Sequence, residues 1–363
     1  MPTPKRTEYP LEPDYAVAPG ETLQETIDAL GMTQAELAVR TGLSTKTINL
    51  VIKGTHVVTQ DTAIKLGRAT GVPVDVWNRL EMNYRRRLAE IEDRKRIAAD
   101  HEWLKTIPTK ELIALGVLPT CSDRADLLKA VFGFFGVSSS EAWRRLWLEN
   151  PSTAYRRSQC FALNPAAAAT WLRLGELKAQ KVECRPYDQA KFKKALLEIR
   201  CLTADLPDDF QDVIVNRCKG AGVAAVFVPE LKKCPVSGAA RWLTPEKALV
   251  QLSLRYKTDD QIWFSFFHEA GHILNDSKKQ FYIDDKTTQG EQEKKANQFA
   301  QDFLIPPARR AELQSLCSEE GIATFAGKIG IAPGIVVGRM QREGIILFSR
   351  FNGLKRRFQW VVQ

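Results

Sequence analysis

Apolar residues recur at helical spacing along most of the chain, and strand-like runs are confined to its last third. Between 109 and 148 the apolar positions fall three or four residues apart, which predicts helices. Residues 224–229 and 248–254 are rich in β-branched and apolar residues and predict strands. The pattern predicts a multidomain, mainly α protein with an α+β part near its C-terminus.

The remaining segments extend this picture. A charged run over 83–100 predicts a long helix that leaves the first domain, and further helix is expected over 151–190. An amphipathic helix is expected over 290–305, because its apolar residues fall on one face, and the prolines at 306 and 307 end it. Residues 322–341 predict more helix, followed by a strand at 345–348.

One helical stretch carries a candidate metal site. His268 and His272 are one turn apart and share a face of the helix, so their ring nitrogens can reach one metal ion. Glu269 lies beside the first histidine, where it can take a proton from a metal-bound water. This H-E-x-x-H arrangement, flanked by apolar residues, is typical of zinc hydrolases. The alternative is a pair of core histidines.

Catalytic zinc usually takes three protein ligands, so one more is expected. The other two histidines of the chain, His56 and His101, lie far upstream, which favours a carboxylate. Glu293 falls on the inward face of the 290–305 helix, whereas its rival Glu291 precedes the apolar register. Asn297, one turn after Glu293, could orient a ligand histidine. Candidates for oxyanion contacts, which the sequence does not rank, are Arg241, Tyr256 and Tyr282.

These motifs resemble the ImmA/IrrE metallopeptidases over roughly residues 195 to 350. The resemblance is carried by the residues 236–243, 268–272, 293–300 and 304–306. It implies a zincin-like α+β domain in which His268, His272 and Glu293 bind Zn²⁺ and Glu269 is the general base. Members cut repressor proteins and thereby release transcription. Lysines at 294 and 295, where an acidic residue is common, depart from the family pattern but leave the ligand set intact.

The N-terminal part shows the sequence pattern of two short helices joined by a tight turn. Thr33 can cap a short helix with Glu36 completing a capping box, Gly42 suits a tight turn, and Ser44 can cap a second helix. This is the pattern of a helix-turn-helix motif, with 45–53 as its recognition helix. A purely structural helical hairpin is the alternative.

Residues 20 to 88 resemble the Cro-and-repressor-like helix-turn-helix family, in particular HigA-type antitoxins. The matching text is 31–38, 42–49 and 66–73, and 77–84 continues it. The resemblance implies a lambda-repressor-like helical bundle that binds double-stranded operator DNA, normally as a homodimer. Gln34 is expected to contact phosphate, and Asn and Lys side chains suit purine edges. The expected DNA-binding residues are Gln34, Ser44, Thr45, Lys46, Thr47, Asn49 and Lys53.

Length and composition set the organisation. The 363 residues allow several domains: a disordered leader at 1–19, the DNA-binding domain at 20–98, a helical middle region at 99–194 and the peptidase domain at 195–363. The net charge of +9 supports DNA binding only weakly, because the helix-turn-helix segment is nearly balanced. The sequence predicts no membrane segment, and its seven scattered cysteines suggest buried thiols in a bacterial cytoplasm.

Together these features predict a transcriptional regulator that carries a zinc-dependent endopeptidase. Its expected substrate is a regulatory protein, namely itself, a repressor or an antitoxin, and a toxin is a possible partner. The alternative is an antitoxin-like repressor whose peptidase fold senses a metal or a partner without catalysis. Association with the nucleoid is expected when the protein is bound to DNA.

Overall fold

A computed structural model describes residues 15–149, 164–275, 281–284 and 290–360 of the chain. The chain divides into two compact units, Met1–His101 and Glu102–Gln363, each of which is described by itself. Most of the leader expected at 1–19 lies outside the described residues, and the first helix begins at Pro19. The middle region expected at 99–194 falls almost wholly within the second unit.

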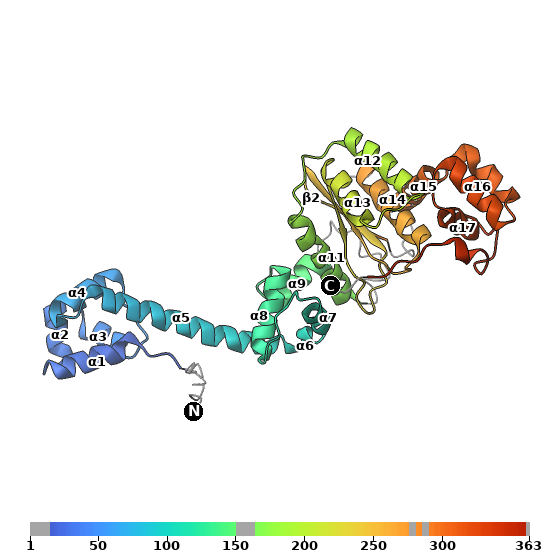
Figure 1. Cartoon of the computed structure of the whole chain (residues 1–363). Helices are drawn as coiled ribbons and strands as arrows, with labels where there is room; N and C mark the ends of the chain where they lie inside the picture. The colour runs from blue at the N-terminus through green and yellow to red at the C-terminus, as the bar shows by residue number, and fades with distance from the viewer. Residues whose placement is uncertain (1–14, 150–163, 276–280, 285–289, 361–363) are drawn as a thin grey trace, which may run out of the picture. The chain divides into compact units, whose positions relative to one another are not determined.

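The first unit is a bundle of helices (Figure 1). They are α1 (Pro19–Ala29), α2 (Gln34–Thr41), α3 (Thr45–Ile52), α4 (Gln60–Thr70) and α5 (Val74–Ala99). Each contributes apolar residues to one core, in which Leu23, Leu37, Ile48, Leu66 and Trp77 are fully buried. This burial of one face of each helix is the main force that holds so small a bundle together.

Local interactions set the starts of α2 and α3 and the turn between these two helices. Thr33 Oγ1 accepts from the backbone N–H of Glu36 at 3.1 Å, and Ser44 Oγ accepts from that of Thr47 at 3.0 Å. Gly42 has φ 68°, a conformation that favours glycine, and thereby ends α2. The capping box predicted for Glu36 is only half formed, because its carboxylate accepts hydrogen bonds from Arg40 instead.

Short helices open the second unit: α6 (His101–Leu104), α7 (Thr109–Ala114), α8 (Arg124–Phe135), α9 (Ser140–Arg144) and the π-helical turn η1 (Arg145–Glu149). Their aromatic side chains form one cluster. The ring of Trp103 stacks on Phe132 at 5.4 Å between centroids and meets Trp143 edge-on at 5.5 Å. The aromatic spacing seen in the sequence therefore marks a small core of this unit.

A four-stranded sheet forms the centre of the second unit. Its strands are β1 (Val223–Phe227), β2 (Gly238–Thr244), β3 (Lys247–Leu252) and β4 (Phe281–Asp284), in the order β1-β3-β2-β4. β1 pairs with β3 in parallel, whereas β2 is antiparallel to both of its neighbours. The strands predicted at 224–229 and 248–254 correspond to β1 and β3, whereas β2 and β4 were not predicted from the sequence.

Different helices cover the two faces of the sheet. One face is covered by α11 (Pro165–Gln180). The other face forms the main core with α12 (Gln189–Leu202), α13 (Phe210–Lys219), α14 (Asp259–Asn275) and α15 (Glu291–Leu304). Gln251 donates a hydrogen bond to the carbonyl of Trp171 in α11 at 2.7 Å. Its neighbours Val250 and Leu252 belong to the main core. This alternation is the period of two that a strand imposes.

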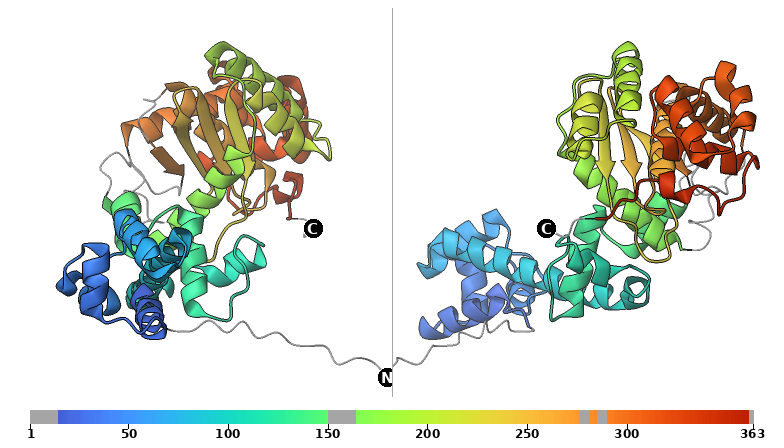
Figure 2. Two further views of the ribbon diagram at one scale, coloured as in Figure 1. Left: turned by 90° about the vertical axis from the view of Figure 1, so that its left-hand side faces the viewer. Right: turned by 45° about the vertical axis from the view of Figure 1, so that its right-hand side comes forward.

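The chain ends with η3 (Pro307–Ser315), α16 (Glu319–Ile329), α17 (Pro333–Arg342) and η4 (Asn352–Leu354). Figures 1 and 2 show α14 and α15 beside the sheet, with α16 and α17 beyond them. α14 and α15 approach closely at Gly271, where an added Cβ would lie 3.3 Å from the Cα of Ala296. A glycine there lets the helix that carries Glu293 come near the two histidines.

The strand predicted at 345–348 is wrong. The chain turns there, no strand of the described residues pairs with 345–348, and Leu347 and Phe348 are 73% and 71% exposed. In the described part of the chain, no single helix is long and apolar enough to cross a membrane. α16 and α17 meet that test by length and composition only as a pair bent by 110°. Their apolar residues, among them Phe325 and Val336, lie in the main core.

Candidate metal centre and DNA-reading helix

His268 and His272 lie on α14 with their side chains on the same face. Their Nε2 atoms are 3.1 Å apart, and both residues are buried. The spacing of four residues on a helix produces this alignment, and Phe266, Phe267 and Ile273 anchor the helix in the core. Two buried imidazoles thus present nitrogens to the same point.

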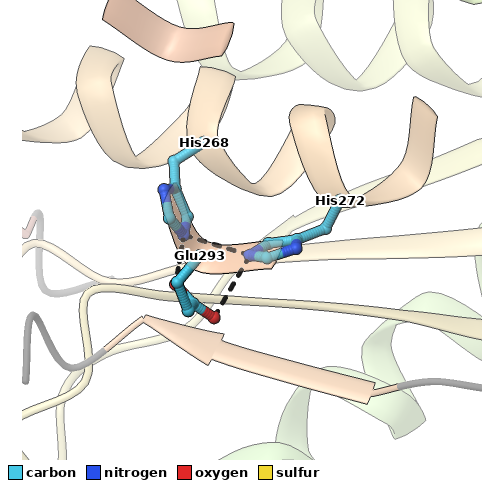
Figure 3. Close-up of side chains that lie close together, drawn as sticks. All are labelled: His268, His272 and Glu293. Atoms are coloured by element: carbon cyan, nitrogen blue, oxygen red, sulfur yellow. Dashed lines mark hydrogen bonds and ion pairs between the residues drawn. The ribbon is translucent and has the colours of Figure 1, made fainter. Parts of the chain in front are cut away.

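Glu293 brings a carboxylate to the same point from α15 (Figure 3). Its Oε2 lies 3.2 Å from Nε2 of His268, and its Oε1 lies 3.4 Å from Nε2 of His272. The rival Glu291 has a side chain that is 83% exposed and pairs with Lys295 on the surface. The structure therefore places Glu293, and not Glu291, beside the histidines.

Electrostatics keep Glu293 ionised. Burial raises the pKa of this carboxyl, but hydrogen bonds from His268 and His272, together with their charges, outweigh burial and lower the pKa to about 2. The group is thus an anionic oxygen donor over the whole physiological pH range. A buried anion between two imidazoles is the donor set expected for a divalent cation.

The spacing of the donors fits zinc. Metal–ligand bonds of about 2.0–2.1 Å in a tetrahedron place neighbouring ligand atoms about 3.3 Å apart. The distances among the two ring nitrogens and the carboxylate oxygens are 3.1, 3.2 and 3.4 Å. Among the described residues, these three side chains form a group of possible metal ligands whose donor atoms are close enough together to hold one ion. The residues present fit Zn²⁺ with three protein ligands and one position open.

Glu269 follows the first histidine and is fully buried. Its carboxylate lies against the backbone of Gly238 in β2: an ideal Cβ on that glycine would lie 2.6 Å from Oε1 and 2.8 Å from Cγ. The strand therefore leaves room for the carboxylate only because residue 238 has no side chain. Gly238 had no role of its own in the sequence-based prediction, although it lies in the segment 236–243 that carries the family resemblance.

Within the described residues, the side chain of Asn297 does not make the expected hydrogen bond to a ligand histidine. Asn297 is half-buried on α15, one turn after Glu293. Nδ1 of His268 has no hydrogen-bond partner within the described part of the chain. The ring of His268 meets that of His272 edge-on with centroids 4.8 Å apart and has Phe264 as a further neighbour at 6.1 Å.

The candidates for oxyanion contacts are placed as follows. Arg241 forms an ion pair with Glu176 at 2.8 Å, which ties its guanidinium to α11. Tyr256 is partly exposed, and Arg255 lies over its ring at 4.8 Å. The side chain of Tyr282 lies outside the described residues.

Comparison with family models matches two separate parts of the chain. Residues 23–77 match the model described as Helix-turn-helix, and residues 237–327 match the model described as IrrE N-terminal-like domain, a peptidase family. The chain joins a helix-turn-helix domain to an IrrE-type peptidase domain. The peptidase match contains both histidines, Glu269 and Glu293. Comparison with curated proteins and with solved structures gave no significant match.

The helix-turn-helix match contains every residue expected to contact DNA. Thr45, Lys46 and Lys53 are exposed on or at the end of α3, and Thr47 and Asn49 are half-buried. Gln34, at the start of α2, accepts a hydrogen bond from Asn49 at 3.5 Å and donates one to Gln24 at 3.2 Å. These amides link α1, α2 and α3 at the end of the bundle where the predicted readers gather.

Ser44, one of the predicted DNA contacts, also caps α3. Its hydroxyl accepts the N–H of Thr47 as the cap of α3 and also bonds the Thr47 hydroxyl at 2.8 Å. Both hydroxyls are thus engaged within the helix start. Since a helix N-terminus attracts phosphate, this end of α3 suits contact with the DNA backbone.

Proposed function

We propose that this protein is a DNA-binding transcriptional regulator whose second unit is a zinc-dependent endopeptidase. The observation that supports hydrolysis most directly is the convergence of His268, His272 and Glu293 beside a buried Glu269. A metal sensor needs the three ligands but has no need of the fourth residue. An intact Glu269 therefore favours catalysis over sensing alone.

A bound Zn²⁺ would supply Lewis acidity and make water a stronger acid at neutral pH. His268, His272 and Glu293 would hold the ion. Glu269 takes a proton from the hydrolytic water and returns it to the leaving amine of the peptide. The apolar surroundings of α14 and the packing against Gly238 hold that carboxylate away from bulk water and in one orientation.

The substrate is an extended segment of a regulatory protein. β4 forms one edge of the sheet, since the strand order is β1-β3-β2-β4, and an edge strand can pair with an extended peptide. The protein cut is this chain itself, a separate repressor or an antitoxin, and a toxin encoded alongside would be released by the cut. Joining both domains in one chain couples proteolysis to promoter control.

The first unit binds double-stranded operator DNA through α3, as a homodimer on paired half-sites. Arginine and lysine outnumber aspartate and glutamate in the whole chain by 52 to 43, which adds nonspecific attraction to DNA. A bacterial cytoplasm, with the protein on the nucleoid when DNA-bound, suits these partners and the free cysteines of the described residues, among them Cys121, Cys184, Cys201, Cys218 and Cys317.

The test compares wild-type protein with Glu269→Gln in a lysate of the source cell. New protein N-termini are identified by mass spectrometry, with and without added zinc. Termini produced by the wild type and absent with Glu269→Gln, at equal zinc content, would support the peptidase. Identical sets of termini would favour the second candidate, a repressor whose peptidase fold binds a metal or a partner without cutting.

A further inference from the structure

A cavity of about 60 Å³ lies between the three helices α14, α15 and α17 of the second unit. Phe264, Leu304 and Ile335 contribute apolar walls from these helices in turn, and most of the lining is apolar. One ordered water needs roughly 10–15 Å³ and two to four polar partners. The cavity therefore has room for a molecule of roughly four to six non-hydrogen atoms, and its apolar walls suit water poorly.

Two polar atoms of the lining residues, Nη1 of Arg339 and Oδ1 of Asp260, are buried without a hydrogen-bond partner within the described residues. The side chain of Arg339 is only 9% exposed, and its Nη1 has no hydrogen-bond partner within the described residues. Its Nε is bound to Glu343, which fixes the guanidinium in place. A buried donor of this kind is stabilised when an acceptor fills the site, and a carboxylate matches the planar guanidinium best.

Charges around the cavity favour an anion. Asp260 lines it, but Oδ2 of this residue is paired with Lys355 at 2.8 Å. Glu343 is shared between Arg339 and Arg310. Arg342 also lines the cavity and adds a further positive charge. The lining itself thus carries one carboxylate, that of Asp260, and two guanidinium groups, those of Arg339 and Arg342, so positive charge is in excess.

We propose that this cavity binds a short-chain carboxylate of about four to six non-hydrogen atoms. The carboxylate receives hydrogen bonds from Arg339, and the aliphatic part lies against Phe264, Leu304 and Ile335. The site is independent of the metal centre, although α14 and α15 contribute to both. The proposal therefore does not depend on whether the protein hydrolyses peptides.

The test uses the full-length protein with butyrate as the probe. The comparison compounds of similar size are 1-butanol, which is uncharged, and butylamine, which is cationic. Saturation-transfer NMR reports binding and a titration gives the Kd. Butyrate is expected to bind at least about tenfold more tightly than either comparison compound, because only it offers the guanidinium an anionic acceptor with two oxygens. Equal binding of all three probes, or no binding of butyrate, would overturn the proposal.

Variants locate the site. Arg339→Gln is expected to weaken butyrate binding by about tenfold or more. Arg310→Gln removes another partner of Glu343 without touching the cavity, and it should leave the Kd unchanged. Ile335→Phe fills the space and should abolish binding without altering any charge. Butyrate binding that survives both Arg339→Gln and Ile335→Phe would place the ligand elsewhere and contradict the assignment.

Discussion

Gly238 and Glu269 are in direct contact across the interface of β2 and α14. An ideal Cβ on Gly238 would lie 2.6 Å from Oε1 of Glu269 and 3.1 Å from its Cδ, closer than a methyl group and a carboxylate can approach. The strand thus sets the position of the proposed base, whereas α14 and α15 set the positions of the metal ligands. Base and ligands can be perturbed separately.

Gly238→Ala should therefore impair hydrolysis and spare metal binding. The new methyl group displaces the Glu269 carboxylate, and a displacement of about 1 Å can cost roughly a hundredfold in rate. Zinc content should stay near that of the wild type. Gly290→Ala is the matched control, because a Cβ on Gly290 meets nothing within 4 Å. Full hydrolytic activity in Gly238→Ala would show that the strand does not position the base.

The buried Asp259 at the start of α14 should make stability depend on pH. Burial raises the pKa of this carboxyl from 3.8 to about 6, and the neighbouring Asp260 adds to the effect against backbone hydrogen bonds that lower it. Between these two values the folded chain retains a proton that the unfolded chain has lost. Stability should therefore fall as pH rises through this window and level off above it.

Asp259→Asn removes that dependence. The asparagine cannot ionise and can still accept the hydrogen bond that Asp260 N–H donates to Oδ1 at 2.8 Å. The difference in Tm between Asp259→Asn and wild type should grow in favour of the variant from pH 4 to pH 6, near the two pKa values, and then stay constant. Asp208→Asn, a change on the exposed surface, serves as the control. A difference in Tm that does not vary with pH would contradict the assignment.

Asn49 should contribute sequence discrimination. It lies on α3, and within the described residues its side chain makes only one hydrogen bond, the long one of 3.5 Å to Gln34, which a base edge can replace. Asn49→Ala should weaken binding to a selected operator by about 1–3 kcal/mol, roughly 5- to 150-fold, with little change on random DNA. Fluorescence anisotropy at a fixed salt concentration measures the affinity for the operator and for random DNA.

A distant exposed residue provides the control for that measurement. Lys65 lies on α4, outside the helix-turn-helix pair α2 and α3, and pairs with Asp61 at 2.6 Å. Lys65→Ala should leave the ratio of operator binding to random-DNA binding unchanged. An equal loss on both DNAs with Asn49→Ala would mean that Asn49 acts on the backbone rather than on a base.

Local patterns predicted much of this molecule. The caps at Thr33 and Ser44, the turn at Gly42 and the helix that carries Glu293 are set by residues within a few positions of one another, so the sequence shows them. The four-residue spacing of His268 and His272 is equally local. The inward face of α15 was enough to favour Glu293 over Glu291.

Contacts between distant segments were not predictable in the same way. β2 has a mixed sequence, Gly238 to Thr244, and is a strand because β3 and β4 pair with it on both sides. The fit of Glu269 against Gly238 depends on that pairing. The apolar run at 345–348 predicted a strand but has no strand beside it, and the chain turns there instead. In each case the partner across space decides the outcome.

The central claim is that His268, His272 and Glu293 form a zinc site, and metal content tests it most directly. The protein is purified without chelator, and its zinc is measured for wild type, Glu293→Ala and the matched surface variant Glu291→Ala. About one zinc per chain is expected in wild type and Glu291→Ala, and a large loss in Glu293→Ala. Equal zinc in all three proteins, or none in the wild type, would contradict the assignment.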